Sequence, residues 1–274
     1  MPRVVALFRH PIKSFTPESV DELTVQSDGR VAGDRVLAFR FADAASPEHR
    51  DGLDHWPKSK GLALQDFPSL AQLRLSYDDA ALRVRLHHAD RLLVDAALDV
   101  DGRAELETAV TDFVLASPDA RRLQRAGRLP LHLVGDGVRS RFQDRAHGYV
   151  SVHSTASISA LGDALQQPID DRRFRSNIVI DGIDAGGELD WIGGIRIGEV
   201  AFMADGPIVR CLATHANPDT GIRDAPVLKT LTGEMGMAEP TLGRLLLLPG
   251  VSGDVDDRSG QGGVIRIGDE VTVG

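Results

Sequence analysis

The chain has 274 residues, of which 42% are hydrophobic, enough to form the core of one large domain or two small ones. Its formal net charge of −9 excludes a broad nucleic-acid-binding surface, because such a surface needs a basic stripe that displaces counterions. The single cysteine excludes an intrachain disulfide and an iron–sulfur cluster held by this chain's own cysteines, and a cytoplasmic location is expected.

The first half of the chain is predicted to be mainly β structure. The apolar run that opens it reaches His10-Pro11 at once, too short for a signal sequence or a membrane span, so no membrane contact is expected. The polar segment 45–60, which contains two prolines, is predicted to be an exposed loop. Apolar or alternating segments bounded by turn signals predict strands at residues 4–8, 23–25, 36–41, 73–75 and 82–86.

Two helices are predicted further along the chain. Apolar residues recur on one helical face of segment 104–116, and Pro118 follows its end. A second helix is predicted to begin at Ser154 or Ser157, either of which suits an N-cap, and to stop at Pro168.

The last hundred residues are rich in short strands punctuated by glycine, a pattern that favours a closed or partly closed barrel. The arginine-rich segment 121–128 is predicted to join two subdomains. We therefore predict a mainly β, α+β fold, with an N-terminal β-barrel-like domain at 1–125 and a second β-barrel domain with a few helices at 126–274. Strands of the second domain are predicted at 131–134 and 177–180, and two similar hairpin elements, each broken at a glycine, are predicted at 195–202 and 265–273.

The signatures of several common enzyme classes are absent. The nine histidines form no HExxH motif, and no CxxC pair exists, so a zinc site is weakly supported. No GxSxG elbow, P-loop or GxGxxG motif appears, which leaves the hydrolase, nucleotide triphosphatase and dinucleotide-binding classes without their usual markers.

The single cysteine, Cys211, is the residue that most needs an explanation. A free cysteine is most often a small buried hydrophobe. Between Arg210 and a polar turn it can also serve as a soft metal ligand, a sulfur carrier or a nucleophile.

The sequence around this cysteine resembles the MOSC domain family, which is named after the C-terminal domain of molybdenum-cofactor sulfurase. The N-terminal part is similar to the family's usual companion, the MOSC N-terminal β-barrel domain. The matching segments, in chain order, are His10-Pro11-Ile12-Lys13-Ser14, Gly33-Asp34-Arg35, Arg173-Phe174-Arg175-Ser176-Asn177, Gly187-Glu188, Arg210-Cys211 and Asn217-Pro218-Asp219-Thr220-Gly221.

The resemblance implies a molybdenum cofactor, with Cys211 as the protein ligand to the metal. A thiolate is a soft anionic ligand that suits such a centre, and the neighbouring Arg210 is expected to favour the thiolate form. The family is also associated with pyridoxal phosphate binding.

The phosphate of the pterin needs cations, hydroxyls or N–H groups around it. The resemblance places Lys13, Ser14, Arg35, Arg175 and Asn177 in this role. Ser154 at a helix start is a further candidate, with plain N-capping as the alternative. Arg210 and Thr214 are expected beside the cofactor. Asp219 is assigned a turn-shaping role, and for its part in catalysis two alternatives stay open, support of the residues that touch the cofactor and a proton relay.

Three functions remain open. The first is a molybdenum-cofactor oxidoreductase that reduces small N-hydroxylated compounds with electrons from a separate flavin or iron–sulfur donor protein. The second is a sulfur carrier or cofactor-delivery protein that uses Cys211 as a persulfide or an anchor. The third is a β-barrel protein with an inert buried cysteine.

Overall fold

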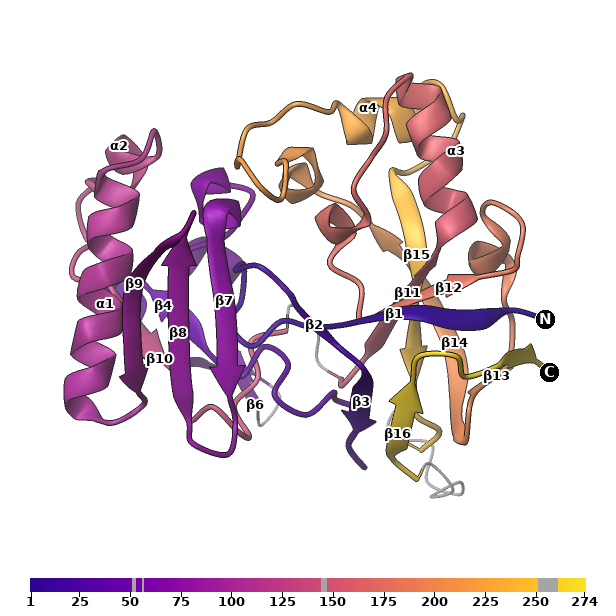
Figure 1. Cartoon of the computed structure of the whole chain (residues 1–274), viewed down its shortest axis with the longest axis horizontal. Helices are drawn as coiled ribbons and strands as arrows, with labels where there is room; N and C mark the ends of the chain where they lie inside the picture. The colour runs from indigo at the N-terminus through magenta and orange to yellow at the C-terminus, as the bar shows by residue number, and fades with distance from the viewer. Residues whose placement is uncertain (51–52, 56, 144–146, 251–260) are drawn as a thin grey trace.

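A computed structural model describes residues 1–50, 53–55, 57–143, 147–250 and 261–274, and shows two lobes side by side (Figure 1). We call them the N-terminal lobe, which carries the longest helix, and the C-terminal lobe, which carries the largest sheet. The described residues include no helix long and apolar enough to cross a membrane.

The C-terminal lobe is built on an eight-stranded sheet. Its strands in spatial order are β17 (Val271–Val273), β13 (Gly194–Ile197), β14 (Val200–Val209), β15 (Thr241–Leu247), β11 (Val150–Ser154), β12 (Ile178–Asp181), β1 (Arg3–Arg9) and β2 (Glu18–Val20). A two-stranded pair, β3 (Glu22–Val25) with β16 (Gly263–Arg266), lies below it in the view of Figure 1.

Only β11 and β12 pair in parallel within the described sheet. A parallel pair needs a crossover, and α3 (Thr155–Leu165) provides it directly after β11. The short helix α4 (Val227–Thr232) packs beside α3. The first strand of the chain, β1, belongs to this sheet, because its buried Val4 and Leu7 join the core of the C-terminal lobe.

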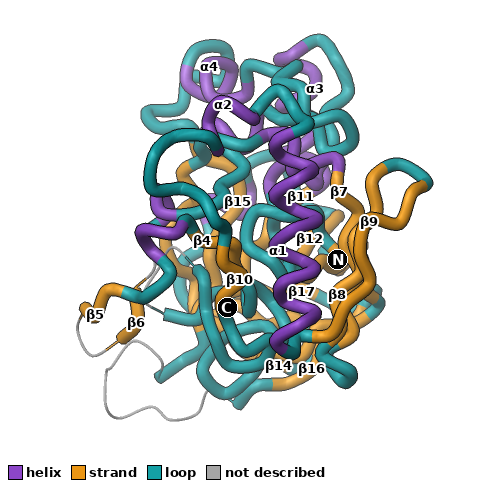
Figure 2. Tube along the Cα trace, turned by 90° about the vertical axis from the view of Figure 1, so that its left-hand side faces the viewer, coloured by secondary structure: helices purple, strands orange, loops and turns teal. Residues whose placement is uncertain are grey.

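The N-terminal lobe combines two small sheets with α1 (Val100–Leu115) and the single turn α2 (Ala120–Leu123). Figure 2 shows α1 on the outer side of this lobe, where it packs along the last strand of the three-stranded sheet. The sheets are β7 (Leu73–Asp78), β8 (Arg83–His88) and β9 (Arg91–Ala97), and the pair β4 (Ala38–Arg40) with β10 (His132–Val134). Helix α1 begins one turn earlier than predicted, because the Asp99 side chain accepts from the Gly102 N–H at 2.8 Å and caps it.

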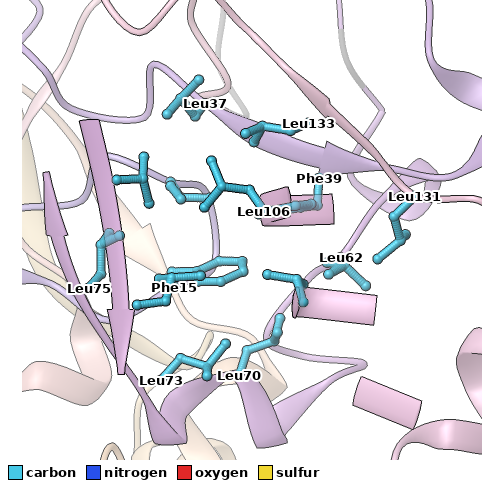
Figure 3. Packing of buried hydrophobic residues seen from close by; sticks show 14 of the residues in the cluster. Phe15, Leu37, Phe39, Leu62, Leu70, Leu73, Leu75, Leu106, Leu131 and Leu133 are labelled. Atoms are coloured by element: carbon cyan, nitrogen blue, oxygen red, sulfur yellow. The ribbon is translucent and has the colours of Figure 1, made fainter. Parts of the chain in front are cut away.

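Leucine and phenylalanine side chains from distant parts of the chain form the core of the N-terminal lobe (Figure 3). Leu131 and Leu133 belong to this core, and β10 pairs with β4, so the chain remains in this lobe for about ten residues after 125. The predicted mainly β, α+β fold class is confirmed. The boundary between residues 125 and 126 stays a prediction.

The segment 45–60 differs from the predicted loop where the structure describes it. It contains the hairpin β5 (Glu48–Arg50) and β6 (Leu53–His55) and a 3-10 turn at Lys58–Lys60. Residues 51, 52 and 56 lie outside the described part of the chain.

Two histidines are buried in the interior. His153 on β11 is 1% exposed, and neither of its ring nitrogens has a hydrogen-bond partner among the described residues. Burial, with Arg210 nearby, lowers the pKa of His153 to about 3. His10 is fully buried, and burial together with Arg175 lowers its pKa to about 3 as well. Both rings are therefore neutral at pH 7 in the folded protein.

We expect these histidines to make the fold acid-sensitive. Because each ring binds its proton near pH 6.5 only when unfolded, stability is complete above that pH and falls as the pH drops towards 3. Each histidine contributes a slope of about 1.4 kcal/mol per pH unit within this window. His153→Leu removes one of the two contributions without loss of stability at pH 7, since it replaces an unpaired polar ring by an apolar side chain.

Urea unfolding of the wild-type protein and His153→Leu at pH 7, 6 and 5 measures the difference, because contributions from carboxylates cancel between the two proteins. If the free energy of unfolding changed with pH in parallel for the wild type and His153→Leu, His153 would be protonated equally in the folded and unfolded states, and the prediction would be wrong.

Candidate functional site

A cavity of about 240 Å³ lies between the lobes beside Cys211. Both lobes supply its walls, with Leu64 and Gln65 from one and residues of β11, β14 and β15 from the other. Five of the lining side chains are cationic, and none of the described lining residues carries a carboxylate. The cationic residues are Lys13, Arg35, Arg173, Arg175 and Arg210.

Most of the residues predicted to hold a cofactor meet in this cavity. In the sequence these residues are spread over 201 positions, from Lys13 to Thr214, and the structure gathers them around the thiol. The lining includes Lys13, Ser14, Arg35, Arg175, Asn177, Arg210, Cys211 and Thr214, but neither Ser154 nor Asp219.

Three of the lining residues have left-handed backbone conformations. The φ angles are 72° at Ser14, 53° at Arg35 and 54° at Arg175, and only three other non-glycine residues in the described chain have positive φ. Such conformations are costly for residues with a Cβ and cluster at functional sites, where surrounding contacts impose them. The turns that aim these side chains are therefore held by the rest of the fold.

The buried carboxylate of Asp34 is one of these contacts. Its Oδ1 accepts from the His10 backbone N–H at 2.7 Å and from Asn177 Nδ2 at 3.2 Å, while Oδ2 accepts from Arg35 Nη1. Burial raises the pKa of Asp34, but Arg35 and the hydrogen bonds outweigh it, so this pKa lies far below its usual value. The charge of Asp34 holds Arg35, whose Nη2 donates to the Arg175 carbonyl at 3.2 Å.

Asn177 lines the cavity, but its amide is bonded within the protein. Its Oδ1 accepts from Ser151 Oγ at 2.9 Å, and its Nδ2 also donates to the Phe8 carbonyl at 3.3 Å. Asn177 thus ties β1, β11 and the Asp34 turn together, and it shapes the cavity by this scaffold.

Arg210 turns into the protein at the end of β14. Its Nε donates to the Leu242 carbonyl and its Nη1 to the Phe174 carbonyl, both at 2.7 Å, and its guanidinium lies 5.3 Å from the Phe174 ring centre. Burial lowers the pKa of Arg210 to about 9, so the group stays charged at pH 7. Gly243 permits this position, since a Cβ there would lie 2.9 Å from Arg210 Nη2.

Cys211 begins the 3-10 turn η6 (Leu212–His215) and is partly exposed. Thr214 Oγ1 donates to its carbonyl at 2.9 Å. No group of three histidine, cysteine, aspartate or glutamate residues in the described chain is arranged to hold a metal ion. Among these four residue types, Cys211 is the member of the described cavity lining. Its thiolate would therefore be the ligand of a metal bound in the cavity.

Ser154 lies away from the cavity and is completely buried. Its Oγ accepts from the Ser157 N–H at 3.1 Å, as an N-cap, and donates to Glu188 Oε2 at 2.9 Å. The predicted cofactor role of Ser154 is therefore corrected to helix capping, the alternative reading of a serine at this position.

Asp219 lies on the surface outside the cavity lining and pairs with Arg74 and Arg172. The predicted catalytic role as a proton relay does not match this position, because a relay must reach the reacting group directly or through one water. The turn-shaping role agrees with the structure, since its backbone N–H is bonded to Asn217 Oδ1 at 2.9 Å.

Sequence reasoning missed several lining residues, among them Gln65, Gln143 and Tyr149. Gln143 Oε1 is buried and has no hydrogen-bond partner among the described residues. No motif or spacing marks these side chains, because they come from loops that only the tertiary structure brings to the cavity.

Comparisons with known proteins agree with the motifs. The model of the MOSC domain matches residues 139–272, and that of the MOSC N-terminal beta barrel domain matches residues 1–121. The predicted boundary falls in the short stretch between the two matches.

Two relatives match a similar length of the chain. Molybdenum cofactor sulfurase of Drosophila grimshawi is 44% identical over 78 residues, which are 28% of this chain and 10% of that protein. Mitochondrial amidoxime-reducing component 1 of Mus musculus is 38% identical over 73 residues, 27% of this chain and 21% of that protein. The matched segment thus spans a small part of either relative.

Among solved structures, the YUAD protein from Bacillus subtilis aligns with 99% of this chain and 94% of its own, at 12% identity and a TM-score of 0.46. The two domain matches together cover nearly the whole sequence in the order that the motifs predict. The chain belongs to the MOSC domain family and carries the MOSC N-terminal β-barrel domain before its MOSC domain.

Proposed function

We propose that this chain binds the molybdenum–pyranopterin cofactor in the cavity beside Cys211 and reduces small N-hydroxylated compounds with electrons from a separate flavin or iron–sulfur donor protein. The observation that carries the proposal is the lining of the cavity. In a chain of net charge −9, five cations and no described carboxylate surround the only thiol. Such a cavity suits a group with a phosphate at one end and a soft metal at the other.

The residues present fit this cofactor. Lys13, Arg35 and Arg175 offer ammonium and guanidinium donors for the phosphate. The unpaired Gln143 Oε1 offers an acceptor for an N–H of the pterin ring, which would satisfy a buried polar atom. Cys211 offers the thiolate.

When bound, the cofactor would supply two-electron redox chemistry, in which cleavage of an N–OH bond consumes two electrons and two protons and releases water. The chain's own residues hold the cofactor and shape the space beside it. Leu64, Val209 and Ala213 are apolar residues of the lining, which would reduce the access of water to a small substrate bound there.

A second candidate function is a sulfur carrier or cofactor-delivery protein. The partial exposure of Cys211 supports it, because a persulfide must be reachable by its acceptor. The two named relatives correspond to the two candidates, since one is an amidoxime-reducing component and the other a cofactor sulfurase.

Replacement of the thiol separates these functions. Wild-type protein from cells that make the cofactor should contain molybdenum and pterin in equal amounts, and Cys211→Ala should lose most of the metal because its protein ligand is gone. Cys211→Ser, with a harder oxygen donor, should retain an intermediate amount. Metal analysis measures the molybdenum content of each protein, and pterin fluorescence measures its pterin content.

Full cofactor retention in Cys211→Ala would refute Cys211 as an anchor. Wild-type protein free of metal but carrying cyanolysable sulfur would favour the carrier. Reduction of an N-hydroxylated base by the loaded protein decides between enzyme and delivery protein.

The cationic residues of the lining, Lys13, Arg35, Arg173, Arg175 and Arg210, which we call the cationic wall, have their own test. Arg175→Gln should weaken cofactor retention by about tenfold or more, because it removes a charge-assisted hydrogen-bond donor. Arg196→Gln, an equal charge change on the exposed side of β13, is the control and should retain cofactor as the wild type does. Molybdenum content after extensive dialysis gives the comparison, and equal losses in both variants would show that only net charge matters.

A further inference from the structure

The segment that carries Cys211 is held together by its own hydrogen bonds. We call residues 211–224 the cysteine segment. Thr214 Oγ1 bonds the carbonyl of Cys211, and Asn217 Oδ1 accepts from the N–H of Asp219 at 2.9 Å. The Asn217 N–H donates to the Ile222 carbonyl at 2.8 Å and closes the turn. The Ala216 N–H donates to the Ala213 carbonyl at 3.2 Å, so only one peptide bond separates the bonded turn of Cys211 from the outer turn at Asn217, and we expect a displacement of the outer turn to move the cysteine.

The carboxylate of Asp219 ties this segment to both lobes. Its Oδ1 accepts from Arg74 of β7 at 2.5 Å, and its Oδ2 accepts from Arg172 at 3.0 Å. Arg172 belongs to the 3-10 turn η4 (Asp171–Phe174), which leads directly to Arg175 in the cationic wall. The carboxylate of Asp219 thus links the cysteine segment to the N-terminal lobe and to the turn η4, which precedes Arg175.

The contact between the cysteine segment and the N-terminal lobe is close. Gly221 has φ of 69°, and a Cβ there would lie 2.5 Å from the Pro68 carbonyl oxygen. Arg223 donates to the carbonyl of Gln65, a residue that lines the cavity. The cysteine segment therefore packs directly against the N-terminal lobe. The ion pairs of Asp219 add further links that fix its position there.

Asp219 remains ionised over the working pH range. Burial opposes its charge, but the hydrogen bonds from Arg172 and Arg74 and the charges of these arginines together outweigh burial and hold its pKa below the usual value. Asp219 and Arg74 are about half exposed, and such pairs contribute little to global stability. Their loss should release the segment without unfolding the protein.

We propose that Asp219 is a positioning residue, which holds the Cys211 thiol at the cationic wall by tying the cysteine segment to Arg74 and Arg172. This deepens the proposed function and rests on it, since the wall is where the cofactor would bind. Residues in the cavity do the binding, and Asp219 acts from outside through the backbone of the segment.

The test uses the full chain without cofactor and follows alkylation of Cys211 by iodoacetamide. At low salt, Asp219→Asn should react about two- to fivefold faster than the wild type, as loss of a surface ion pair allows local opening. The wild type should approach this rate at 1 M salt, because salt screens the pairs. Asp219→Glu should restore most of the protection.

Asp95→Asn is the matched control. Asp95 also bridges two arginines on the surface, Arg83 at 2.6 Å and Arg85 at 3.0 Å, but all three lie on β8 and β9, and none of them lines the cavity. This variant should alkylate at the wild-type rate at every salt concentration.

Equal rates in the wild type and Asp219→Asn would overturn the proposal. A loss of reductase activity in Asp219→Asn with wild-type thiol reactivity and molybdenum content would overturn it too, because that is the behaviour of a proton relay. The alkylation assay needs no metal, so a wild-type protein that binds no molybdenum would contradict the proposed function separately.

Discussion

The carboxylate of Asp34, only 3% exposed, accepts hydrogen bonds from the end of β1, from Asn177 before β12 and from Arg35 in its own turn. A buried charge is tolerable only when it is paired and its lone pairs are bonded, so this one carboxylate constrains three segments at once. Arg35 and Arg175 both have left-handed backbone, and Arg35 connects the two turns, because it donates to Asp34 and to the Arg175 carbonyl. The cavity depends on that constraint, since both arginines line it.

Acidic residues near the cavity are also paired with arginines. Asp34 and Asp224 pair with Arg35 and Arg173 from behind the wall, and neither carboxylate lines the cavity. The guanidinium groups are thereby already oriented, which would reduce the side-chain entropy lost on binding the proposed cofactor. A strongly acidic chain can therefore present a locally cationic cavity.

The path of the chain explains why the cavity has walls from both lobes. The first strand, β1, lies in the sheet of the C-terminal lobe, and its end passes into the turn that carries Lys13 and Ser14. In the other direction, β10 stays with β4 in the N-terminal lobe before the chain returns to the large sheet at β11. Repeated crossings, including the return of the chain to the large sheet at β2, thus hold the lobes together at the cavity, and the bonds of Asp219 and Arg223 add side-chain links beside it.

Several elements were predictable because local pattern decides them. Alternation marks β7 and β8, and a serine before an apolar helical face marks the start of α3. Ser154 shows where such reasoning stops. A serine at a helix start looks the same in sequence whether it caps the helix or binds a phosphate, and only the buried Glu188 beside it distinguishes the two. The same is true of Asp219. The sequence of a turn near a cysteine does not show whether its carboxylate faces the cavity or the protein surface.

The sequence by itself determined the fold class, the family and the chemistry available around Cys211, because these depend on residue type, periodicity and ordered motifs. Only the tertiary structure decided which side chains share the cavity and which lie behind or outside it. Arg35 and Arg175 are 140 positions apart and meet through one hydrogen bond. Contacts at that separation are set by strand pairing and burial, which no local pattern records.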